Sequence, residues 1–183
     1  PPPPPPLSHY SLPCQTYLTR QQSGGAADAL AKVPGDKNAN SAASYWFERT
    51  YQALGAESYA RLEDSFPDSW RTHQLRAEDF ALRGDRDGAI KEYEAALHLR
   101  PDEAELHEAT GEFYLDNHSD EDARRELEKA QTLDRSRTKT LYLLGRLYIQ
   151  DNENEKAVPF LQRALQLQPN LNEAGGLLGT AYV

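Results

Sequence analysis

The five histidines of this 183-residue chain, His9, His73, His98, His107 and His118, are the side chains best suited to bind a transition metal ion or to transfer a proton near neutral pH. A protein zinc site needs three or four ligands, and closely spaced histidines with a cysteine or carboxylate usually supply them. No two of these histidines have such a spacing with a carboxylate as the third ligand. We therefore expect surface or interface histidines, no bound metal and no other cofactor.

The single cysteine, Cys14, could form a nucleophile and base pair with His9. Both residues follow a run of six prolines, which favours an extended polyproline segment without a supporting shell of side chains. Gly24-Gly25 reads as a flexible break and not as a phosphate-binding loop. One cysteine also rules out a disulfide within the chain. We predict that the protein is not an enzyme.

Composition restricts the partners. The formal charge of −9 disfavours non-specific binding to nucleic acid and to anionic membranes, both of which need clustered Lys and Arg. The mean hydropathy of −0.79 is strongly polar, and no apolar run is long enough to span a membrane. The chain begins at Pro1 and has no Met, so we expect a soluble, mature or excised fragment whose compartment stays open.

A repeat of 34 residues organises most of the chain. Ala89, Ala123 and Ala157 are separated by this interval, which is typical of a solenoid of short structural units. Other positions recur in step with them: Ala77, Gly111, Gly145 and Gly179; Phe80, Tyr114, Tyr148 and Tyr182; Tyr93, Leu127 and Leu161; Leu99, Leu133 and Leu167.

The repeat divides the chain into segments. Each full unit should contain two helices joined by a tight turn at Gly84-Asp85, Asn117-His118 or Asp151-Asn152, because Gly and Asn tolerate the backbone that ends a helix. The expected segments are 1–40, proline-rich and irregular with a short helix around 26–32; 41–69, one long helix or a degenerate unit; three full units at 70–103, 104–137 and 138–171; and 172–183, the truncated first helix of a fourth.

Small and large residues alternate so that helices can pack closely. Gly111 and Tyr114 lie three residues apart and so share one helical face. Ala123, Leu127 and Ala130 form one apolar stripe on the following helix. We expect the small residues to contact a neighbouring helix directly, and the stability to come from contacts between successive units.

These columns resemble the tetratricopeptide repeat over residues 70–183, and weakly over 36–69. His73 and Arg135 depart from the family, which usually has a large apolar residue and a proline there. The resemblance implies an all-α, right-handed α-solenoid following the irregular proline-rich segment. It also implies a concave groove, lined by the first helix of each unit, that binds peptides or protein surfaces without catalysis.

The groove should be lined by first-helix residues that face away from the alanine stripe. The candidates are Arg71, Gln74, Glu78, Glu105, Glu108, Glu112, Lys139, Tyr142, Arg146 and Ile149. The same face also carries Ala81, Leu82, Leu115, Asp116 and Gln150. Residues 104–137 contain ten Asp or Glu against five Lys or Arg, which predicts either a solvated acidic face or selection of basic or polar peptide segments.

Some members of the family hold a C-terminal carboxylate with a clamp of Lys, Asn and Arg. The matching positions here are Gln74, Glu78, Ala109, Glu112, Lys139 and Leu143. Only Lys139 fits the clamp, so we predict that this chain lacks it.

The favoured hypothesis is therefore a non-catalytic scaffold that binds a peptide or protein segment in its groove. One alternative is a self-assembling element, a homodimer formed through residues 172–183, because this helix carries apolar residues such as Leu177, Leu178 and Tyr182. A further alternative is the regulatory part of a larger complex.

Overall fold

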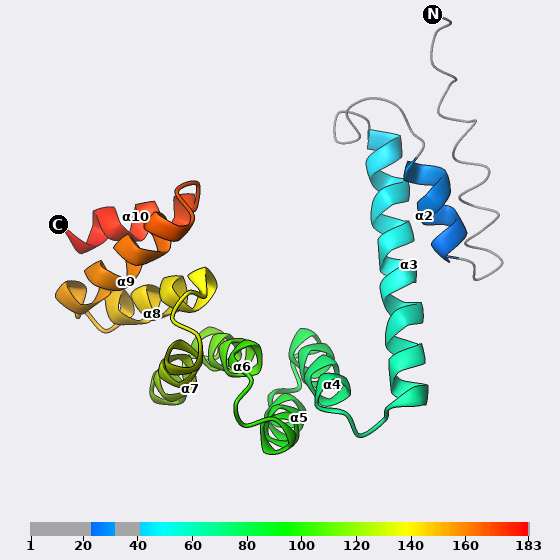
Figure 1. Ribbon diagram of the computed structural model, residues 1–183, viewed down its shortest axis with the longest axis horizontal. Helices are drawn as coiled ribbons and strands as arrows, with labels where there is room; N and C mark the ends of the chain where they lie inside the picture. Colours follow the sequence, from blue (N-terminus) through cyan, green and yellow to red (C-terminus); the bar gives the residue numbers. More distant parts are fainter. Residues whose placement is uncertain (1–22, 32–40, 183) are drawn as a thin grey trace, which may run out of the picture. The chain divides into compact units, whose positions relative to one another are not determined.

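The computed structural model describes residues 23–31 and 41–182, and every element within these residues is a helix (Figure 1). His9, Cys14 and the proline run lie outside the described residues. The chain divides into two compact units, residues 1–67 and 68–183. The helices are α2 (Ser23–Ala31), α3 (Ser41–Ser65), α4 (Trp70–Leu82), α5 (Arg86–Leu99), α6 (Ala104–Asp116), α7 (Asp120–Leu133), α8 (Thr138–Gln150), α9 (Asn154–Leu167) and α10 (Asn172–Ala181).

In the first unit, α2 packs against α3, and Ala26 and Thr50 are fully buried. Helix α3 is continuous over 25 residues. Pairs of side chains four residues apart support its exposed face, such as Arg61 and Glu57, whose charged atoms lie 2.8 Å apart. No turn interrupts α3, so residues 41–65 form one long helix.

The second unit is a stack of helix pairs. Helix α4 packs with α5, α6 with α7 and α8 with α9, while α10 contacts both α8 and α9 (Figure 1). The prediction of an all-α solenoid of paired helices is confirmed for this unit. None of the described helices combines the length and the apolar composition needed to cross a membrane.

The turn inside each pair has the same backbone geometry. Gly84, His118 and Asn152, 34 residues apart, adopt positive φ angles of 76°, 56° and 59°. The next amide bonds back to a carbonyl in the last helical turn: Asp85 to Phe80 at 2.9 Å, Ser119 to Tyr114 at 2.9 Å and Glu153 to Tyr148 at 2.8 Å. This pairing across a left-handed residue is the Schellman end of a helix, and it reverses the chain.

The small residues of the repeat lie where paired helices approach most closely. Ala89, Ala123 and Ala157 are completely buried. A Cβ added at Gly111 would lie 2.7 Å from the Leu127 side chain, well inside van der Waals contact. The 34-residue period therefore reflects the contacts that recur between paired helices.

Candidate protein-binding groove

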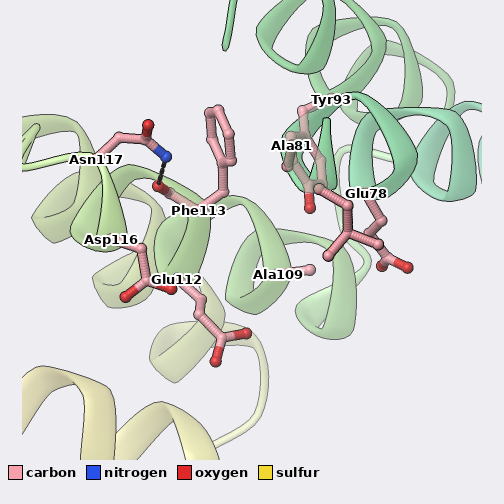
Figure 2. A pocket seen from close by; sticks show the side chains of 9 residues that line it. Glu78, Ala81, Tyr93, Ala109, Glu112, Phe113, Asp116 and Asn117 are labelled. Atoms are coloured by element: carbon pink, nitrogen blue, oxygen red, sulfur yellow. Dashed lines mark hydrogen bonds between the residues drawn. The ribbon is translucent and has the colours of Figure 1, made fainter. Parts of the chain in front are cut away.

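A cavity of about 450 Å³ opens between α4 and α6, on the face that the sequence assigns to the groove (Figure 2). Two of the ten candidates, Glu78 and Glu112, line this cavity. Its full lining is Glu78, Ala81, Leu82, Tyr93, Ala109, Glu112, Phe113, Asp116 and Asn117. Acidic side chains thus surround a recess with apolar walls.

The three carboxylates of the cavity differ in their partners. Glu112 pairs with Lys139 at 2.6 Å, and Asp116 pairs with Arg146. Glu78 accepts a hydrogen bond from the Gln74 amide at 2.9 Å and has no cationic partner among the described residues. Two cations therefore compensate two of the three carboxylates, and one negative charge is left.

Tyr93 reaches the cavity from α5. The side chain is only 3% exposed, and its ring centroid lies 5.3 Å from that of Phe113. Burial raises the pKa of the Tyr93 hydroxyl, and the nearby carboxylates of Glu78 and Glu112 raise it further. The hydroxyl is therefore neutral at physiological pH, and Figure 2 shows it directed into the cavity.

At one end of the groove, an ion pair connects the first two repeats. Arg71 Nη1 donates to Glu105 Oε1 at 2.9 Å and to Gln74 Oε1 at 3.0 Å. Arg71 and Glu105 occupy the same position of successive repeats. The hydrogen bond from Arg71 is the main reason why the pKa of Glu105 is lowered.

Glu108 occupies a different environment from its neighbours on α6. It is 5% exposed, and Arg137 donates to both of its carboxylate oxygens, at 2.8 and 3.1 Å. The Thr140 hydroxyl also donates to it. Both oxygens of the Glu108 carboxylate therefore accept hydrogen bonds from within the chain. These bonds connect α6 to the start of α8.

The remaining candidates belong to α8. Tyr142 and Ile149 are half-buried and pack against the hydrophobic core, and neither lines the cavity. Lys139 and Arg146 enter the site only through their ion pairs with α6. Within the candidate set, Glu78 and Glu112 alone share the cavity.

Sequence reasoning missed a repeated polar pair behind the groove. His73 Nδ1 lies 2.7 Å from Glu92 Oε2, and His107 Nδ1 lies 2.8 Å from Glu126 Oε2. The period itself contains the signal, because both histidines and both glutamates are 34 residues apart. The same positions of the third repeat hold core residues, Leu141 and Phe160.

These histidines join the two helices of a repeat. His107, 7% exposed, bonds Glu126 through one ring nitrogen and the Pro101 carbonyl through the other, at 2.8 Å. Among the residues that the structure describes, no three His, Cys, Asp or Glu side chains are grouped so that they could hold a metal ion.

A family model of the tetratricopeptide repeat matches residues 138–171, one helix pair of the stack. Residues 138–171 therefore contain a tetratricopeptide repeat. The matched segment contains α8 and α9, and α4–α5 and α6–α7 repeat its helical lengths and its turn geometry.

Several solved structures share the fold. The first tetratricopeptide-repeat domain of Spaghetti (RPAP3), bound to the HSP90 peptide SRMEEVD, has a TM-score of 0.60 and 23% identity, covering 62% of this chain and 90% of that one. The second domain of human RPAP3, in complex with the HSP70 peptide SGPTIEEVD, has a TM-score of 0.56 and 20% identity over 63% and 99%. PilF from Pseudomonas aeruginosa has a TM-score of 0.61 and 19% identity over 95% and 66%. No curated protein sequence matches the chain.

Proposed function

We propose that this tetratricopeptide-repeat protein is a non-catalytic scaffold that holds an extended segment of a partner protein along α4, α6 and α8. The cavity between α4 and α6 carries the proposal. It is a recess on the expected ligand face, and small-molecule and side-chain sites are usually such partly apolar hollows with a few polar groups. Similar folds that bind peptides, such as the two RPAP3 domains, support the same class of function.

The charge of the groove argues for a ligand unlike those peptides. SRMEEVD and SGPTIEEVD both end in EEVD, and are therefore acidic at that end. Here the recess carries Glu78, Glu112 and Asp116, and the single clamp-like cation, Lys139, is already paired with Glu112. Like charges repel, so the proposed ligand is a basic or polar segment.

A peptide-display selection on the purified chain tests the proposal. Selected peptides should bind the wild type. Glu112→Lys should weaken their binding at least about tenfold, which corresponds to about 1.4 kcal/mol, because it places a positive charge against a basic ligand. Glu121→Lys, an equal charge reversal at an exposed position of α7, is the matched control and should bind normally.

Two further results would contradict the proposal that a basic or polar segment binds in the groove. Selected peptides that bind both variants as tightly as the wild type would place the binding surface elsewhere. Synthetic SRMEEVD should bind more weakly than the selected peptides, and tighter binding of SRMEEVD would remove the proposed preference for basic segments.

Self-association through α10 is the competing proposal. Leu177 and Leu178 on this helix are only partly covered by the core, and Tyr182 is 65% exposed. Light scattering over a wide concentration range tests it, since a dimer through this surface should dissociate on dilution and on Tyr182→Glu substitution. A monomer at all concentrations would eliminate it.

A further inference from the structure

We propose that the cavity between α4 and α6 is a subsite for one basic side chain, an arginine or lysine of the bound segment. This inference rests on the proposed function, and it assigns the recess a ligand chemistry that the fold alone does not give. The shape of the cavity, its charge and the Tyr93 hydroxyl support this assignment.

The walls suit the stem of a long basic side chain. Ala81, Leu82, Ala109 and Phe113 supply apolar surface on both sides of the recess. Lys and Arg pack their methylene groups on such surface while the charged end reaches polar groups. Leu82 is 89% exposed, so a ligand stem would also cover apolar area that now faces water.

Among the described residues, the cavity lining carries one negative charge that is not compensated, which matches the charge of one basic side chain. Of the three carboxylates in the lining, Glu112 and Asp116 are paired with Lys139 and Arg146. Glu78 is bonded only by the neutral Gln74 amide among the described residues. A single positive side chain next to Glu78 therefore neutralises the recess, and a charge-assisted hydrogen bond is stronger than the neutral one it would join.

Tyr93 supplies the second polar contact. Tyr93 is only 3% exposed. Its hydroxyl points into the cavity and has no hydrogen-bond partner among the described residues (Figure 2). A polar group in such a place is satisfied by water or by a ligand. Because the hydroxyl is neutral, its oxygen can accept a hydrogen bond from a guanidinium or ammonium group.

The test uses N-acetyl-arginine methylamide, which presents the side chain without charged ends. Titration into the ¹⁵N-labelled chain should shift the amides of Glu78, Tyr93 and Glu112 with a dissociation constant on the order of millimolar, the range of so small a ligand. N-acetyl-citrulline methylamide has nearly the same shape without the charge and should shift them far less. Equal shifts by the two compounds, or no shifts at these amides, would overturn the subsite.

Two conservative variants locate the binding. Glu78→Gln removes the uncompensated charge and should weaken the arginine compound about tenfold, while Tyr93→Phe removes only the acceptor and should weaken it about threefold. Glu121→Gln, on the exposed side of α7, should leave it unchanged. Unaltered affinity in Glu78→Gln would also overturn the subsite.

The outcome separates this inference from the proposed function. If selected peptides still depend on Glu112 but the arginine compound does not bind, the scaffold proposal stands and the subsite is wrong. If the arginine compound binds at Glu78 but no protein segment is selected, the recess is a cation site and the scaffold proposal is wrong.

Discussion

Glu108 and Arg137 form a two-point ion pair between the second and third repeats. Arg137 Nη2 lies 2.8 Å from Glu108 Oε1, and Nε lies 3.1 Å from Oε2. The glutamate belongs to α6, whereas the arginine directly precedes α8, so the pair holds consecutive first helices together. Such a paired geometry is the strongest form of the Arg–carboxylate interaction.

Replacement of Glu108 by Gln should therefore destabilise the second unit. The variant leaves Arg137 without its charged partner at a nearly buried site, and we expect the free energy of unfolding to fall by about 2 kcal/mol. Urea unfolding followed by circular dichroism measures this. Glu112→Gln is the control, because its pair with Lys139 is partly exposed and should contribute less than about 1 kcal/mol. An equal decrease in the free energy of unfolding of the two variants would show that the Glu108–Arg137 pair contributes no more to stability than the exposed pair does.

Gly111 and Gly179 occupy the same position of the repeat but should respond oppositely to alanine. At Gly111 a new Cβ would meet Leu127, with contacts of 2.7 and 2.8 Å to its side chain and 3.2 Å to its backbone nitrogen. Overpacking of this kind costs about 1–3 kcal/mol. At Gly179 nothing lies within 4 Å, so alanine should stabilise α10 by roughly 0.5–1 kcal/mol. The melting temperatures of both variants test this prediction. A Gly111→Ala variant more stable than the wild type would contradict the close approach of α6 and α7.

Gly84 tests the turn geometry of the first repeat. Its φ of 76° disfavours any residue with a Cβ, although the space around it is open. We expect Gly84→Ala to lower the free energy of unfolding by about 1 kcal/mol, through backbone strain alone. Gly176→Ala in α10 also meets nothing within 4 Å, but it lies in a right-handed helix and should not destabilise. A neutral Gly84→Ala would mean that the turn relaxes without cost.

The His107–Glu126 pair should make stability depend on pH. Burial opposes the charged imidazolium, but the hydrogen bonds to Glu126 and to the Pro101 carbonyl outweigh it and raise the pKa of His107 above 6.5. Burial likewise opposes the carboxylate, but the bond with His107 lowers the pKa of Glu126 below 4.5. The histidine contribution is complete below pH 6.5 and is lost as the pH rises through the raised pKa. The glutamate contribution is complete above pH 4.5 and is lost as the pH falls through the lowered pKa.

The stabilisation from this pair is therefore greatest between about pH 4.5 and 6.5. Melting temperatures across pH 3–9 should show this maximum in the wild type. The combined His107→Leu and Glu126→Phe variant, which copies Leu141 and Phe160 of the third repeat, should flatten the profile. His98→Gln is the control at an exposed position. A wild-type profile identical to that of the combined variant would refute the coupling.

The repeat, the class of fold and most contacts of the small residues could be predicted from the sequence. Gly179 is an exception, because nothing lies within 4 Å of a Cβ added there. Gly111, Ala123 and Leu127 could be assigned to helix contacts because local periodicity decides which residues share a helical face. The turns were also predictable as pairs of residues. Which member of the pair adopts the left-handed conformation, His118 and not Asn117, depended on where α6 ends.

The partners of the carboxylates on the acidic face of α6 depend on the tertiary structure. Glu105, Glu108 and Glu112 share that face in sequence, and the spacing made all three equal candidates for the groove. Cations from neighbouring repeats then separate them: Arg71 binds Glu105, Arg137 covers Glu108, and Lys139 pairs with Glu112 at the edge of the cavity. The physical reason is that the availability of a charge is set by partners across repeats, and helical periodicity within one repeat carries no information about them.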